Sequence, residues 1–182
     1  IPNSIATHTR HLIALGINNH GDRQAQHSHL AGQFLFWVAV ERQIINADLV
    51  KSATVTFLEG YLFDRPEAKA AFVRASEIAQ AADRRVALTL SDLFCVDRHR
   101  DSFRHLVKNH IDVLFANEAE IKALYEVDDF ETALAKVRAE TRVAAITRSE
   151  KGAVIVSGDE EVRVDADPVE HVVDTTGAGD QF

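Results

Sequence analysis

The chain has 182 residues, of which 46% are hydrophobic, and its formal net charge is −8. This much apolar sequence can form one sizeable core, so a single soluble domain is predicted and a disordered chain is not. The acidic balance argues against nonspecific nucleic-acid binding, because such binding normally needs a basic face.

The sequence also predicts the location of the protein in the cell. Its one cysteine, Cys95, has no partner for an internal disulfide. No apolar run approaches the length needed to cross a membrane, and the N-terminus does not resemble a secretory signal. We therefore predict a cytoplasmic protein without a membrane partner. The chain contains no Met, so its first residue is not a retained initiator, and both ends are interpreted as cuts in a longer protein.

The first 45 residues or so show no clear pattern of strands and helices. Five histidines crowd this segment, and the spacing of His27 and His29 is compatible with metal binding. Scattered solvated histidines are the favoured interpretation, because no acid or cysteine completes a recognisable ligand set. The apolar stretch at 32–40 fits either a strand or a short helix.

From Thr54 onward, apolar runs alternate with amphipathic runs, which predicts a layered α/β fold. The predicted strands are 54–62, 86–90, 113–116, 143–147, a hairpin of 153–156 with 161–164, and 169–173. The predicted helices are 66–84, 96–108, 118–126 and 130–140. Asn117 and Thr147 then lie at the carboxyl ends of strands, where open α/β sheets place ligand-binding residues.

The last nine residues read DTTGAGDQF. Glycines let backbone N–H groups turn toward one point, where they can hold phosphate oxygens. A carboxylate beside that point, here Asp180, can take a proton from an attacking hydroxyl. The alternative is an ordinary helix start, since glycine-rich turns followed by Asp are common N-caps.

The string DTTGAGD closely resembles the C-terminal signature of the PfkB family, the ribokinase-like carbohydrate and nucleoside kinases. NEAE at 117–120 resembles the family's Asn-x-x-Glu motif, and TRSEKG at 147–152 resembles its nucleotide turn. LEGYLFD at 58–64 and LTLSDLFCVDRHR at 88–100 resemble bacterial adenosine kinases. The resemblance covers residues 48–182 and implies a three-layer α/β/α fold with a mainly parallel sheet, incomplete at both ends. Residues 1–47 stay outside it.

The resemblance implies transfer of phosphate from ATP to the hydroxymethyl group of a nucleoside, with adenosine favoured, or of a sugar. Asp180 matches the family's general base. The backbone N–H groups of Gly177, Ala178 and Gly179 match an anion hole for the transferring phosphoryl group, which suits a reaction that needs positioning and charge stabilisation. A homodimer is compatible with the resemblance.

Two further signature residues match a cation site. Asp174 and Thr176 correspond to positions that contribute oxygens to a monovalent cation such as K⁺ in many family members. The alternative for Asp174 is a strand end that fixes the turn through an Asx-type bond.

The pair Asn117 and Glu120 matches residues that place Mg²⁺, generally through water, and order the phosphates. The two residues lie one helical turn apart, and Mg²⁺ favours oxygen ligands. The alternative is a capping box at a helix start. Thr147 and Gly152 match the nucleotide turn, where the hydroxyl bonds an ATP phosphate and the glycine permits close backbone approach. Ser149 stands where many relatives have Gly.

Glu59 matches an acidic position that contacts substrate hydroxyls in some sugar kinases, and a structural glutamate is an equal alternative. Cys95 is interpreted as a packing or loop residue, and the basic residues at 98–100 as a solvated helix face. Two other classes of function stay open: a non-catalytic fragment that keeps part of the fold, and a binding module built on the same scaffold.

Overall fold

The computed structural model describes residues 12–15, 35–38, 45–168 and 171. Its strands are β1 (Leu12–Leu15), β2 (Leu35–Val38), β3 (Val55–Glu59), β4 (Arg85–Thr89), β5 (Val113–Asn117), β6 (Val143–Thr147), β7 (Ala153–Ser157) and β8 (Glu160–Val164). Its helices are α1 (Ala47–Ser52), α2 (Pro66–Ala81), α3 (Leu93–Asn109), α4 (Glu118–Tyr125) and α5 (Phe130–Glu140), with 3₁₀ turns η1 (Gly60–Asp64) and η2 (Ser149–Lys151).

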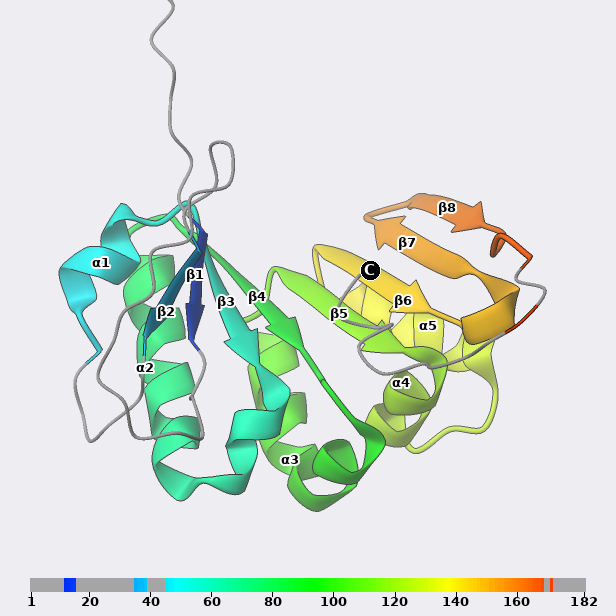
Figure 1. The fold of residues 1–182 in the computed structure, drawn as a ribbon, viewed down its shortest axis with the longest axis horizontal. Coiled ribbons are helices and arrows are strands. Elements are labelled where there is room, and N and C mark those ends of the chain that lie inside the picture. The colour runs from blue at the N-terminus through cyan, green and yellow to red at the C-terminus, as the bar shows by residue number, and fades with distance from the viewer. Residues whose placement is uncertain (1–11, 16–34, 39–44, 169–170, 172–182) are drawn as a thin grey trace, which may run out of the picture.

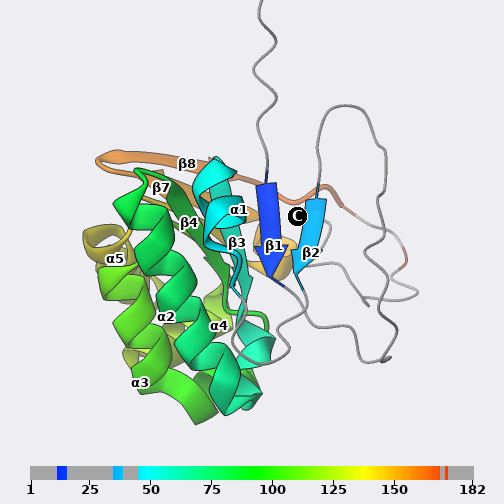
Figure 2. The same ribbon diagram turned by 90° about the vertical axis from the view of Figure 1, so that its left-hand side faces the viewer.

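The strands of the described part form one sheet in the order β2-β1-β3-β4-β5-β6-β7-β8. Strands β1 to β6 run parallel, and β7 and β8 continue the sheet as an antiparallel hairpin at one edge (Figure 1). Helices α2 to α5 lie on one face of the sheet (Figure 2). The mainly parallel α/β fold that the sequence predicts is confirmed.

Local sequence explains where several helices begin. Pro66 opens α2, where its missing N–H and fixed φ cost little. Asp92 caps α3 by accepting a hydrogen bond from the Cys95 N–H at 2.8 Å, and Asp129 caps α5 by accepting one from the Thr132 N–H at 2.8 Å. Such caps satisfy N–H groups that have no partner within the helix, so each fixes a helix start.

The structure differs from the predicted elements in a few places. The strand predicted at 54–62 ends at Glu59, because the chain turns into η1 at Gly60. Helix α3 starts at Leu93, earlier than predicted, and α2 ends at Ala81. The apolar stretch at 32–40 contains a strand, β2, rather than a helix. Of the strand predicted at 169–173, the structure describes only His171.

The core lies between the sheet and its helical layer. Phe63 of η1 stacks on Phe103 of α3 at 4.5 Å between ring centroids and meets Phe72 of α2 at 5.1 Å. All three rings are almost completely buried. Truncating one such ring to Ala typically costs about 3–5 kcal/mol, so this trio holds η1 and the two helices together.

A polar network joins α3, α4 and α5. The Arg104 guanidinium forms a bidentate pair with Glu140 and stacks over the Tyr125 ring, 4.2 Å from its centroid. The Tyr125 hydroxyl donates to Glu140 at 2.9 Å. Hydrogen bonds from Arg104 and Tyr125 hold the pKa of the Glu140 carboxyl below its ordinary value. No helix in the described part of the chain has the length and apolar character of a membrane span.

Candidate active site

The carboxyl ends of the parallel strands lie together along one side of the sheet, perpendicular to the strand direction. We refer to this side as the carboxyl edge. Asn117 ends β5 and Thr147 ends β6, and the two residues are paired in register. Glu59 ends β3 and is paired with Thr89 of β4. This edge is where open α/β sheets bind ligands. The structure therefore brings Asn117 and Thr147 together, whereas β4 separates them from Glu59.

A cleft of about 860 Å³ opens beside Asn117 and Thr147. Its walls come from the start of α4, from η2 and from the β7–β8 hairpin. The hairpin contributes apolar surface through Ala153, Ile155 and Val164. A cleft of this size, with an apolar wall and polar groups at strand ends, has the character of a site for a small molecule.

The turn between β6 and β7 has a backbone that requires glycine at one position. Gly152 has φ of 81°, in the left-handed region, and a Cβ atom there would lie 1.9 Å from the Val164 carbonyl oxygen. The Arg148 N–H donates to the Gly152 carbonyl at 2.8 Å and closes the turn. Ser149 has φ of 53°, which also favours glycine. The chain therefore keeps a glycine-type backbone at the position where many relatives have Gly.

Arg148 is a residue of this cleft that the sequence analysis missed. Its Nε donates to Glu118 Oε2 at 2.8 Å, and its guanidinium lies 3.7 Å from the centroid of the Phe130 ring. Lys151 Nζ lies 3.9 Å from the other oxygen of Glu118. The sequence signal was an arginine directly after Thr147, but its fixed position depends on contacts with α4 and α5 that the sequence does not display.

Asn117 and Glu120 form a reciprocal capping box at the start of α4. Glu120 Oε2 accepts from the Asn117 backbone N–H at 2.9 Å, and Glu120 Oε1 accepts from Asn117 Nδ2 at 2.8 Å. The Glu120 N–H donates to Asn117 Oδ1 at 2.8 Å. Glu120 is 4% exposed, and burial raises the pKa of its carboxyl. The capping box, which the sequence left open as the alternative to a Mg²⁺ site, is therefore present. A role of this pair in placing Mg²⁺ stays a prediction.

Replacing Glu120 by Gln is expected to change the pH dependence of stability. Because burial raises the pKa of this carboxyl, folding favours its protonated form. Its contribution to the free energy of unfolding is full below the ordinary pKa of 4.5 and is lost as pH rises through the folded-state pKa. The Gln amide has only one acceptor oxygen, so the variant loses one of the two hydrogen bonds that Asn117 donates, a loss that costs about 1–3 kcal/mol.

Urea unfolding of both proteins checks this expectation. The Gln variant lacks the carboxyl titration, so its stability deficit should narrow as the pH is raised above the ordinary pKa of 4.5. A deficit that stays constant or widens over that range would contradict the assigned direction of the pKa shift.

Exposed apolar side chains lie near the carboxyl ends of β3 and β4, on the same side of the sheet as the cleft. Tyr61 of η1 is 42% exposed, and Leu93 and Phe94 at the start of α3 are 38% and 73% exposed. These side chains follow the ends of β3 and β4. Sequence reasoning missed them as site candidates, although Tyr61 and Phe94 lie within LEGYLFD and LTLSDLF. Large apolar groups this exposed at a ligand-binding edge are candidates for contact with a flat, apolar ligand.

The signature residues Asp174, Thr176 and Asp180 and the anion-hole segment 177–179 lie outside the described part of the chain. His27 and His29 of the N-terminal segment also lie outside it. Their assigned roles stay predictions. Cys95 lies within the described part and is fully buried, and burial raises the pKa of its thiol to about 11, which fits a packing residue and not a nucleophile.

Comparison with known proteins decides the family. A family model described as pfkB family carbohydrate kinase matches residues 5–182. The chain belongs to this family. The match starts well ahead of residue 48, where the recognisable motifs begin, so it includes most of the segment that showed no pattern. The two short strands β1 and β2 lie within that segment.

Solved structures agree with this pfkB assignment. An adenosine kinase from Sinorhizobium meliloti and a probable sugar kinase from Rhizobium etli are each 45% identical to the chain, with TM-scores of 0.72. Each alignment covers 81% of this chain and 46% of the other. A putative ribokinase II from E. coli, solved with ATP and Mg²⁺, is 24% identical, with a TM-score of 0.66 over 75% of this chain and 45% of its own, and shows the fold.

The chain therefore spans about half the length of these pfkB relatives, 46% for the first two. No match was found among curated protein sequences.

Proposed function

We propose that the protein to which this chain belongs transfers the γ-phosphoryl group of ATP to a hydroxymethyl group, with adenosine as the favoured acceptor. The cleft at the ends of β5 and β6 is the observation that supports this most directly. In the reaction the acceptor oxygen forms a bond to the γ-phosphorus, the bond from that phosphorus to the β,γ-bridging oxygen breaks, and ADP leaves. Such chemistry needs positioning and charge stabilisation more than covalent participation by the protein.

The cleft suits the phosphate donor. Thr147 offers a hydroxyl at a strand end, the Gly152 turn lets backbone come close, and Ile155 and Val164 offer apolar surface for a base. Arg148 and Lys151 supply cationic groups near the strand ends. We propose that the phosphates lie toward the turn and the base against the hairpin.

Magnesium fits this cleft in an indirect role. Among the described lining residues, the cations are Lys122, Arg148 and Lys151 and the acids are Glu118, Glu150 and Asp165. These charges balance, so a triphosphate needs a divalent cation beside it. Asn117 and Glu120 offer only oxygen acceptors to such an ion, but both carboxylate oxygens of Glu120 already accept hydrogen bonds from Asn117. We propose that this pair orders ion-bound water, and Mg²⁺ would neutralise phosphate charge.

The acceptor fits the other part of the edge. Tyr61, Leu93 and Phe94 present apolar surface beyond β3 and β4, as a purine base requires, and Glu59 lies at the end of β3 where it could meet ribose hydroxyls. We propose that an adenosine bound there directs its hydroxymethyl group toward the β5–β6 cleft, as the transfer requires. The 45% identity to the Sinorhizobium meliloti adenosine kinase supports the same acceptor.

The signature residues complete the proposal. Asp180 takes the proton of the attacking hydroxyl, and the N–H groups of Gly177, Ala178 and Gly179 stabilise the charge on the transferring group. Asp174 and Thr176 contribute oxygens to a monovalent cation. A cytoplasmic location and a homodimer stay predictions.

An acceptor panel tests the proposed function. The protein expressed from its complete reading frame is incubated with Mg-ATP and adenosine, ribose or fructose, and ADP and phosphorylated product are measured. Adenosine should give the highest kcat/KM. Turnover with a sugar alone would support the second candidate, a sugar kinase, which the equal identity to the Rhizobium etli protein favours. No turnover with any acceptor would leave the non-catalytic binding module.

The 182-residue chain by itself is the companion sample. Because it spans 46% of each of its first two relatives, we expect it to show little or no turnover. Robust activity of this chain with Mg-ATP and adenosine would contradict that expectation.

A further inference from the structure

The 3₁₀ turn η1 connects the end of β3 to α2 and carries Tyr61 at the proposed acceptor site. Its last residue, Asp64, is held by two side chains of α3. Arg98 binds it in a bidentate pair, with Nε 3.1 Å from Oδ1 and Nη2 2.9 Å from Oδ2. His99 Nε2 lies 2.9 Å from Asp64 Oδ1. We refer to Asp64, Lys69, Arg98 and His99 as the His99 cluster.

His99 occupies an unusual place in α3. Its backbone has φ of −124° and ψ of 23°, which are not helical values, so the helix is kinked there. Its ring is 17% exposed, and Nδ1 lies 3.1 Å from Lys69 Nζ of α2. Because an ammonium group only donates hydrogen bonds, Nδ1 is the acceptor and the Nε2–H donates to Asp64. One imidazole therefore joins η1, α2 and α3.

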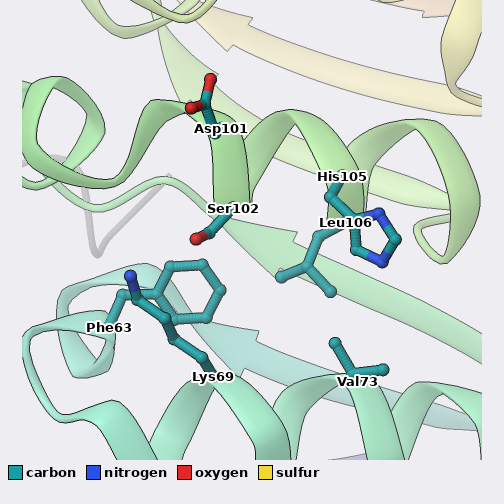
Figure 3. Close-up of a pocket in the computed structure, with 7 residues that line it drawn as sticks. All are labelled: Phe63, Lys69, Val73, Asp101, Ser102, His105 and Leu106. Atoms are coloured by element: carbon teal, nitrogen blue, oxygen red, sulfur yellow. The ribbon is translucent and has the colours of Figure 1, made fainter.

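The remaining contacts fix the rest of η1. The Cys95 thiol donates to the Gly60 carbonyl at 3.2 Å, and a Cβ atom on Gly60 would lie 2.6 Å from the Thr89 carbonyl oxygen. Phe63 packs its ring edge-on to His99 at 6.2 Å between centroids. Figure 3 shows Lys69 beside the Phe63 ring at the groove between α2 and α3, and its Nζ lies 5.8 Å from the ring centroid.

A metal ion is the other use that these side chains could have. Asp64, Cys95 and His99 each offer a ligand atom within 4.8 Å of the others. However, Arg98 and Lys69 already donate to the Asp64 and His99 atoms that a metal would need. Two cations beside the ligand atoms also oppose a third, and the Cys95 thiol is buried and donates to Gly60. The geometry therefore favours positioning over metal binding.

We infer that the His99 cluster positions η1 for recognition of the phosphate acceptor, with His99 and Asp64 as positioning residues. This inference rests on the proposed function, because it places Tyr61 against the acceptor. Asp64 and Arg98 are about half exposed, so their ion pair alone contributes little, and the partly buried imidazole that joins three elements carries most of the effect. Disturbing it should move the acceptor surface and leave the donor cleft in place.

The test compares two substitutions of His99 in the protein expressed from its complete reading frame. The side-chain amide of Gln extends about as far from the backbone as Nε2, so His99→Gln can still donate to Asp64. The amide of Asn stops near the Nδ1 position, so His99→Asn cannot. We expect His99→Asn to raise KM for adenosine about fivefold, with kcat and KM for ATP within about twofold of wild type, and His99→Gln to restore most of the loss.

Glu140→Gln of α5 is the control. It weakens the bidentate pair with Arg104, which lies in the same helix as His99, α3, but this pair is away from the acceptor edge. It should leave KM for adenosine unchanged. Asp64→Ala gives a second check. Combined with His99→Asn, it should cost less than the sum of the two single effects, since both remove the His99–Asp64 hydrogen bond, and Asp64→Ala also removes the Arg98 pair. Equal KM for adenosine in His99→Asn and wild type would overturn the inference, as would a matching change in Glu140→Gln.

Amide hydrogen exchange provides a readout that does not depend on the acceptor. Residues 60–64 should exchange faster in His99→Asn than in wild type or His99→Gln. If wild type does not phosphorylate adenosine while this difference is present, the proposed acceptor fails and the role of His99 in fixing η1 stands. If exchange is unchanged, the positioning role fails whatever the activity.

Discussion

Asp180→Asn is expected to lower kcat of the protein expressed from its complete reading frame by about 10²–10⁴-fold, the range typical of losing a general base. The amide oxygen cannot take the proton of the attacking hydroxyl, so the reaction proceeds with water as the base. Because the substitution keeps the shape of the side chain, the Kd for ATP should stay within about threefold of wild type.

Single-turnover kinetics and equilibrium nucleotide binding separate these two effects. The control is Asp83→Asn, which makes the same chemical change in an exposed turn between α2 and β4. This turn lies at the amino end of β4, away from the carboxyl ends that form the candidate site. Asp83 has φ of 54°, which Asn tolerates, so the control should fold and react like wild type. An Asp180→Asn rate equal to that of Asp83→Asn would remove Asp180 from the role of base.

Gly152→Ala should destabilise the protein by about 2–4 kcal/mol and weaken ATP binding, because strain and a backbone clash act together. Gly152 has φ of 81°, and the added Cβ would lie 1.9 Å from the Val164 carbonyl oxygen. Backbone atoms cannot rotate away as a side chain can, so η2 or the β7–β8 hairpin must move. Both line the cleft that we assign to ATP.

Gly158→Ala separates the strain from the clash. Gly158 has φ of 58°, also in the left-handed region, but a Cβ there meets nothing within 4 Å. This substitution should cost only about 1–2 kcal/mol, the strain of a non-glycine residue in that region, and leave ATP affinity unchanged. Urea unfolding and nucleotide titration of both variants measure the difference. Equal losses in the two variants would mean that the close approach to Val164 does not constrain the turn.

Much of the fold could be predicted from local patterns. Helix α5 and strand β6 have the predicted bounds, and Pro66 marks the start of α2. These elements were predictable because apolar periodicity and helix-start residues act over a few neighbours in the sequence. Strands β1 and β2 have only four residues each, and one of them could not be distinguished from a helix. The pairing of β1 with β3 and of β2 with β1 depends on distant residues.

The candidate site divides in the same way. Asn117 and Thr147 were placed at strand ends by pattern, and the register of β5 and β6 makes them neighbours. Arg148 was missed because its position depends on Glu118 and Phe130. The predicted strand continued through Gly60, but the backbone of β4 packs against that glycine and the chain turns into η1. No local pattern could show this contact.

The sequence by itself determined the family motifs, the alternation of strands and helices, and the residue types at the ends of β5 and β6. These features depend on short stretches of the chain, in which residue spacing and side-chain chemistry are enough to indicate them. The tertiary structure decided that Glu120 is buried against Asn117, that Arg148 lines the cleft, and that His99 joins η1 to two helices. The positions of Arg148 and His99 depend on partners at least 30 residues away, which only folding brings within hydrogen-bonding distance, and the burial of Glu120 depends on the elements packed around α4.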